Sequence, residues 1–236
     1  MSLAPPQTLG LYSWQREAAL TRLQFFRDQM MNRVFPAFAN IEQEALEHGQ
    51  AIFKAGLAGP ASPYGDESHL AEHAHEAAVV HHGELEQVLQ TSINFAAATI
   101  FHAHWETPVR DWLGREAPMF GASKTQQKKI EITKVEDIAT FLAGHGWPFA
   151  KAGWFEKLDE LRLVANTVKH ARGDSARELC KRRRTLFWPY NIVGEDEHLG
   201  NAEPDGTNLV IEPEDFAAYA AAVEAFWVEA PAGDED

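Results

Sequence analysis

The sequence predicts an all-α protein that folds as an up-and-down bundle of five to six helices with long irregular loops. Apolar residues recur at spacings of three and four along most of the chain, which is the periodicity of an amphipathic helix. Alternating strand patterns are almost absent, and breaker residues cluster between the periodic segments. We expect one helical domain over residues 1–229 and a disordered acidic tail over 230–236.

The first helical segment is predicted from Tyr12 to about Lys54, as one long helix or a broken pair. Pro36 is expected to kink it, because proline removes a backbone hydrogen-bond donor. Residues 56–66 are rich in glycine and proline and predict a loop. A second helix is expected to begin near Ser68, a residue suited to the N-cap position.

The strongest helical pattern runs from Glu84 to Trp112 and predicts the central buried helix of the bundle. Pro108 is expected to mark a kink near its end. The apolar face that this prediction places in the core is formed by Leu85, Val88, Leu89, Ile93, Phe95, Ala96, Ile100 and Phe101.

A shorter helix is predicted after the polar segment 118–132. Thr133 and Glu136 have the spacing of a capping box, which predicts a helix to about Ala143. A turn-rich linker then leads to the next helix, over 154–171.

The C-terminal part of the chain continues the helical pattern. Gly173 is expected to end the preceding helix in the left-handed conformation, and a short basic helix follows over 174–184. Residues 189–206 predict an acidic loop, and residues 207–211 a short strand. A last amphipathic helix is expected over 213–229, with proline at its first position.

The composition is that of a soluble globular protein, with 45% hydrophobic and 24% charged residues. No apolar run approaches the roughly 20 residues that cross a bilayer, and the N-terminus lacks the pattern of a secretory signal. Cys180 is the only cysteine, which excludes an intrachain disulfide or a multi-cysteine zinc site and fits a reducing compartment. We therefore expect a cytoplasmic protein that does not associate with membranes.

The formal net charge of −14 argues against broad affinity for nucleic acid, but the charge is uneven. Residues 151–190 hold ten Lys or Arg against five acids, a local charge of +5, which leaves −19 for the rest of the chain. This segment is either a solvated surface or an approach path for an anionic ligand such as RNA. The anion-binding hypothesis involves Lys169, Arg172, Lys181, Arg182, Arg183 and Arg184.

Three polar residues share one face of the helix predicted over 154–171. Arg162, Asn166 and His170 are spaced i, i+4 and i+8, and an apolar stripe runs beside them. A polar stripe that borders a buried seam is a candidate site. The alternative is structural: Asn166 and His170 would hydrogen-bond neighbouring helices, and a protonated His170 would interact favourably with the helix C-terminal dipole.

The order of a long apolar helix, a linker, a helix that ends in Asn-x-x-x-His before a glycine, and a final amphipathic helix resembles the HEPN superfamily over about 84–229. The resemblance implies an α-helical bundle that commonly dimerises. Its usual signature is Arg, a polar residue that is often Asn, three variable residues and His. Asn166 and His170 match this signature, whereas Ala165 stands at the arginine position and Arg162 lies one turn earlier.

The same resemblance implies a homodimeric, metal-independent ribonuclease or RNA-binding protein of a toxin–antitoxin or phage-defence system, with an antitoxin as partner and no cofactor. In this hypothesis His170 is the general acid/base and Asn166 orients it or the phosphate. Arg162 or Lys169 offsets the negative charge on the phosphate. The competing hypothesis is a non-catalytic helical protein-interaction module, which Ala165 and the acidic net charge favour.

A metal-dependent helical enzyme is a third hypothesis, suggested by a histidine-rich region. His69 and His73 are spaced i, i+4, which suits chelation of a transition metal when a third ligand joins them. His102 and His104 are two residues apart and would point to different sides of a helix. No H-E-x-x-H motif is present, and we expect no metal site.

Overall fold

The computed structural model describes residues 10–58, 67–119, 123–125, 127, 135–188 and 204–233. These residues are predominantly helical, so the all-α prediction is confirmed. The β-structure among them is limited to two isolated bridges, Leu11 with Ala232 and Phe187 with Leu209. Among the described helices, none is long and apolar enough to span a membrane.

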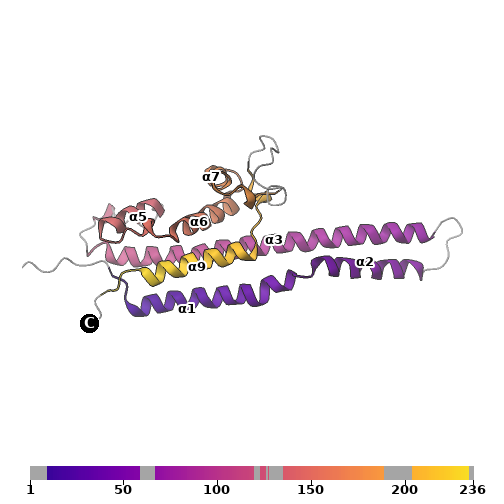
Figure 1. Cartoon of the computed structure of the whole chain (residues 1–236), viewed down its shortest axis with the longest axis horizontal. Helices are drawn as coiled ribbons and strands as arrows, with labels where there is room; N and C mark the ends of the chain where they lie inside the picture. The colour runs from indigo at the N-terminus through magenta and orange to yellow at the C-terminus, as the bar shows by residue number, and fades with distance from the viewer. Residues whose placement is uncertain are drawn as a thin grey trace, which may run out of the picture. The chain divides into compact units, whose positions relative to one another are not determined.

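The helices follow the order expected from the periodicity (Figure 1). A π-helical turn (Met30–Val34) and a 3-10 turn (Phe35–Phe38) separate the first two helices, which confirms the broken pair around Pro36. The α-helices of the described residues are α1 (Ser13–Gln29), α2 (Ile41–Leu57), α3 (Glu67–Glu116), α5 (Val135–Gly144), α6 (Phe155–His170), α7 (Asp174–Arg182) and α9 (Pro213–Glu229).

The chain forms two compact units. The first unit comprises residues 1–28 and 95–236, and the second comprises residues 29–94. Helix α3 contributes to both, because it joins the helix expected near Ser68 to the pattern over 84–112. The single domain over 1–229 stays a prediction.

An aromatic cluster forms the core of the first unit. The ring of Phe226 on α9 lies 5.0 to 5.9 Å from five other aromatic rings, measured between centroids. These rings pack mostly edge to face, an arrangement that aromatic quadrupoles favour. They belong to Trp105, Trp147, Phe149, Trp154 and Trp227.

The C-terminal half of α3 is the buried central helix that the sequence predicts. Phe101, Trp105, Val109 and Trp112 are fully buried at successive helical spacings. Pro108 lies inside α3, and the helix continues past it to Glu116. The core of the first unit therefore lies along this half of α3.

The two ends of the described chain meet in the first unit. The amide of Leu11 donates to the carbonyl of Pro231 at 2.8 Å, and the amide of Gly233 donates to the carbonyl of Leu11 at 3.0 Å. A Cβ on Gly10 would lie 2.2 Å from the Cα of Gly233, so this approach requires glycine. Residues 230–233 of the tail that was expected to be disordered are thus hydrogen-bonded, and residues 234–236 lie outside the described part.

The end of α6 differs in detail from the prediction. Ala171, rather than Gly173, takes the C-cap position, with φ of 51° and ψ of −62°. The carbonyl of Ala171 accepts a hydrogen bond from the amide of Gly206 at 2.7 Å. A Cβ on Gly206 would lie 2.6 Å from the carbonyl oxygen of Thr167, so only glycine allows this segment to cross the end of α6.

The short strand expected over 207–211 is wrong. The chain there forms a 3-10 turn (Gly206–Asn208), held by a hydrogen bond from the Thr207 amide to the Asp205 side chain. Only Leu209 then pairs with Phe187 in a single bridge. The β-branched residues that suggested a strand instead lead into α9, which begins at Pro213 as predicted.

The second unit contains α2 packed along the N-terminal half of α3, and we call this pair the α2–α3 hairpin (41–57 and 67–94) (Figure 1). The two helices meet through small residues. A Cβ on Gly49 would lie 2.3 Å from Cγ2 of Val79, and a Cβ on Gly83 would lie 3.9 Å from that of Ala45. Apart from Asn94, the buried positions of the described hairpin are Ala45, Gly49 and Ala71.

Most of the large apolar residues of the hairpin are exposed and lie outside this seam. The prediction that Leu85, Val88 and Leu89 belong to a buried face is wrong, because all three are exposed, and Ala96 and Ile100 of the same predicted face are exposed as well. The contact between α2 and α3 uses a different face of α3, which includes Ala71, Val79 and Gly83. Helical periodicity identifies an apolar face but not the helix that covers it.

Candidate functional site

Arg162, the first residue of the polar stripe on α6, forms ion pairs within the first unit. Its Nε donates to Asp159 Oδ1 at 2.6 Å, and its Nη2 lies 3.2 Å from Glu136 Oε1 on α5. The side chain is only 18% exposed. Arg162 therefore ties α6 to α5, and its positive charge is already balanced by two carboxylates.

Two of the cations predicted to bind anions are also paired. Arg182 Nη1 donates to Asp159 Oδ2 at 2.6 Å, so Asp159 joins Arg162 of α6 to Arg182 of α7. Arg183 Nη1 donates to Glu160 Oε1 at 2.7 Å. These contacts make the basic segment after α6 part of the packing between α6 and α7.

Glu160 is the centre of a second group of contacts. It is buried and accepts hydrogen bonds from Lys157 at 2.9 Å and from the hydroxyl of Tyr219 on α9 at 2.8 Å, in addition to Arg183. Arg183 also pairs with Asp215 near the start of α9. The network thus joins α6, the end of α7 and α9.

The pKa values of these groups reflect the pairing. Burial alone would raise the pKa of Asp159, but hydrogen bonds from Arg162 and Arg182 outweigh it and lower this pKa below its ordinary value. The pKa of Glu160 is lowered for the same reason, since its three hydrogen-bond donors outweigh its burial. Burial beside Glu160 raises the pKa of Tyr219. At pH 7 the carboxylates of Asp159 and Glu160 are therefore ionised, and the hydroxyl of Tyr219 is protonated.

The remaining residues of the predicted site lie near the end of α6. Asn166 is half-buried, whereas Lys169 and His170 are exposed. Arg172 is also exposed and donates to Asp205 Oδ2 at 2.7 Å. The stripe is therefore divided into a paired, half-buried start at Arg162 and an exposed end at His170.

The last two predicted anion-binding residues differ in exposure. Lys181 is exposed on α7, and Arg184, in the 3-10 turn after α7, is half-buried. Together with Lys169 and His170, Lys181 belongs to the part of the predicted basic surface that faces solvent.

His102 on α3 is a polar residue of this region whose place the sequence pattern does not reveal. It is 2% exposed, and neither ring nitrogen has a hydrogen-bond partner among the described residues. Its Nδ1 lies 3.7 Å from Glu106 Oε2. Its pKa is lowered to about 4, chiefly by burial; the charge of Glu106 opposes this shift, and the charges of Lys169 and Arg162 add to it. His102 is therefore a neutral, buried histidine near the polar side of α6.

The histidine-rich region does not assemble a metal site in the described residues. His69 and His73 lie side by side on α3, with ring centroids 4.5 Å apart, and His48 of α2 stacks on His82 at 4.8 Å. Within the described ranges, no three His, Cys, Asp or Glu side chains are placed to hold a metal ion. The alternative built on His69 and His73 therefore has no third ligand there.

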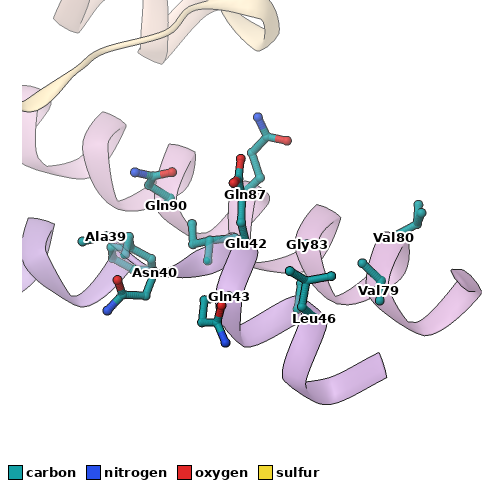
Figure 2. A pocket seen from close by; sticks show the side chains of 13 residues that line it. Ala39, Asn40, Glu42, Gln43, Leu46, Val79, Val80, Gly83, Gln87 and Gln90 are labelled. Atoms are coloured by element: carbon teal, nitrogen blue, oxygen red, sulfur yellow. The ribbon is translucent and has the colours of Figure 1, made fainter. Parts of the chain in front are cut away.

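A groove of about 830 Å³ lies on the α2–α3 hairpin, and all of its lining residues belong to the second unit (Figure 2). Its apolar lining includes Leu46 of α2 and Val79, Val80 and Gly83 of α3. Glu42 is the charged residue among the described lining residues. Sequence reasoning missed this groove because apolar helix faces were expected in the core; the small residues at the helix seam were the available signal.

Comparison of the chain with protein-family models, with curated proteins and with solved structures finds no match.

Proposed function

We propose that the chain is a non-catalytic helical protein-interaction module that binds its partner through the α2–α3 hairpin. One observation carries the proposal: the fully buried apolar residues of the described hairpin are alanine and glycine, whereas most of its large apolar side chains are exposed. Soluble monomers rarely expose so many large apolar residues on one small unit unless a partner covers them. The exposed set is Leu46, Ile52, Leu57, Leu70, Val80, Leu85, Val88 and Leu89.

The energetics of burial support this proposal. Covering a Leu or Val side chain contributes about 1.5–3 kcal/mol. A few such residues are enough to hold a partner after the entropic cost of association is met.

The ion pairs of the first unit also favour an interaction module over catalysis. An arginine that stabilises a transition state must direct its donors at the developing charge. Arg162 and Arg183 direct theirs at Asp159 and Glu160 instead. In the proposal, these ion pairs of the first unit are structural and take no part in catalysis.

The test is site-specific photo-cross-linking of the full chain in the cells that produce it. A photoreactive residue at Leu70 or Leu85 is expected to yield a discrete adduct with a second protein. The same residue at Lys151 or Glu156, which are exposed in the first unit, is the control and is expected to yield none. Adducts from the control positions alone, or none from the hairpin, would refute the proposal.

RNA cleavage or binding is the second candidate function, favoured by the exposed pair Lys169 and His170 at the end of α6. This is the HEPN-like ribonuclease hypothesis, with His170 as general acid/base and a homodimer that brings two α6 helices together. Labelled tRNA and total RNA are incubated with the protein in EDTA beside the His170→Ala variant. Cleavage that survives EDTA and disappears in H170A supports this function, and intact RNA with the folded protein counts against it.

A further inference from the structure

We infer that the groove of the α2–α3 hairpin binds a cationic amphipathic helix of a partner protein. The inference rests on the proposed interaction function and deepens it, because it names the docking surface and the chemistry of the partner. The groove comprises residues of 38–46 and 79–90 (Figure 2).

The shape of the groove suits a helix. Its lining on α3 extends over 79–90, which is about 17 Å of helix, or about three turns. A third helix laid beside two packed helices would place apolar residues at i, i+3 or i+4 and i+7 along this length. Leu46 of α2 and Val80 of α3 are exposed apolar residues of the lining, and a helix laid in the groove would cover both.

The centre of the groove is open because Gly83 has no side chain. A Cβ at this position would meet only the Cβ of Ala45, at 3.9 Å. Small residues at a helix surface allow a neighbouring helix to approach closely. The absence of a side chain at Gly83 therefore leaves space in the groove for a partner helix.

The charge of the second unit selects a basic partner. Residues 29–94 contain two basic and nine acidic side chains, a formal charge of −7, which is half of the total charge of the chain. Glu42 lines the groove, and none of the described lining residues is basic. A field of this sign attracts a cationic segment and speeds its association.

The same charge argues against a second copy of the hairpin as the occupant. Two hairpins would bring −7 against −7 around an apolar contact, and like charges at an interface oppose association. The other polar side chains of the lining, Asn40, Gln43, Gln87 and Gln90, are neutral and do not offset this repulsion. A helix with leucine-like residues on one face and Lys or Arg on the other fits both the apolar lining of the groove and the negative charge around it.

The experiment measures binding of a designed probe to the full chain by fluorescence anisotropy. The probe is an 18-residue helical peptide with leucines on one face and lysines on the other, and its counterpart carries glutamates in place of the lysines. We expect the lysine peptide to bind, the glutamate peptide to bind at least about tenfold more weakly, and high salt to weaken the lysine peptide.

Two valine variants test whether binding is located in the groove. Val80→Asn removes an apolar contact in the groove without changing the charge, whereas Val88→Asn makes the same change at an equally exposed site on α3 outside it, since their exposed fractions are 59% and 64%. We expect V80N to weaken binding of the lysine peptide about tenfold and V88N by less than about twofold. Circular dichroism checks that both variants remain helical.

The outcomes separate this inference from the proposed function. Equal losses in V80N and V88N, or equal binding of both peptides, would overturn the cationic-helix site even if Leu70 and Leu85 still cross-link to a partner. A dimer in sedimentation experiments that V80N abolishes and V88N preserves would assign the groove to a second copy and also overturn it. Selective loss in V80N with charge-dependent binding supports the site.

Discussion

Arg183, directly after α7, donates a 2.7 Å hydrogen bond to the buried carboxylate of Glu160 on α6. Glu160 is surrounded by protein, so its charge needs partners that replace water. Arg183 supplies one of them from a segment 23 residues further along the chain. Arg183 belongs to the basic run that was predicted to bind anions, and its contact with Glu160 instead gives it a structural role; we call this contact the clamp.

Replacing Arg183 with Ala is therefore expected to destabilise the protein by about 2–3 kcal/mol, because a buried carboxylate loses one charged partner but keeps Lys157 and Tyr219. Urea denaturation followed by circular dichroism measures the change. Arg177→Ala on α7 is the matched control, since its partner Asp174 is fully exposed and the midpoint should not move. Equal midpoints for R183A and the parent chain would contradict the clamp.

Acid is expected to destabilise the protein in two steps, which follow from the pKa shifts. His102 has a folded pKa of about 4, below the ordinary value of about 6.5, so the unfolded state binds its proton first. The free energy of unfolding is not reduced by His102 above about pH 6.5, where the ring is neutral in both states. It falls by roughly 3 kcal/mol as the pH decreases to about 4. The lowered pKa values of Asp159 and Glu160 add a further loss below about pH 4, as these carboxylates become protonated.

The histidine step is tested with His102→Leu. The ring nitrogens of His102 have no hydrogen-bond partner in the described structure, so leucine loses no bond there. The variant is expected to keep its stability between pH 6.5 and 4.5, where the parent chain loses it, and to show the same decline below pH 4. A parallel decline of both proteins from pH 6.5 would refute the assignment to His102.

Phe226 is expected to be the most sensitive position of the core, because its ring contacts five aromatic neighbours. Phe226→Ala should destabilise the protein by about 3–5 kcal/mol, through lost burial and the cavity left behind. Leucine at this position fills part of that volume, so Phe226→Leu should destabilise the protein less than Phe226→Ala. Phe25→Ala on α1 is the control, since that ring is 67% exposed, and thermal unfolding should show almost no change for it.

Much of the fold follows from local signals in the sequence. The broken pair around Pro36 and the start of α9 at Pro213 are set by backbone chemistry within a few residues, so periodicity and capping rules locate them. The burial of Trp105 and Trp112 follows from the same periodicity. These features need no knowledge of distant contacts.

The site was harder to predict, because its residues are defined by partners far along the chain. Arg162 and His170 share a helix face, as expected, but Glu136 and Arg182 determine that the start of the stripe is paired. The exposure of Leu85 and Val88 has a similar cause: α2 contacts a different face of α3. No spacing within a single helix contains this information.

The glycines of the hairpin provide the last prediction, since one is required by packing and the other is not. A Cβ on Gly49 would lie 2.3 Å from Val79 Cγ2 and 3.1 Å from the backbone oxygen of His75. Gly49→Ala is therefore expected to force α2 and α3 apart and to destabilise the hairpin by about 1–3 kcal/mol.

Gly83→Ala is the matched variant. Its Cβ meets only Ala45, at an ordinary contact distance of 3.9 Å, and alanine is the better helix former by about 1 kcal/mol. Hydrogen exchange of the hairpin amides should therefore slow in G83A and accelerate in G49A. If both substitutions stabilise the hairpin, the close seam between α2 and α3 is refuted, and with it the reason that the large apolar residues remain exposed.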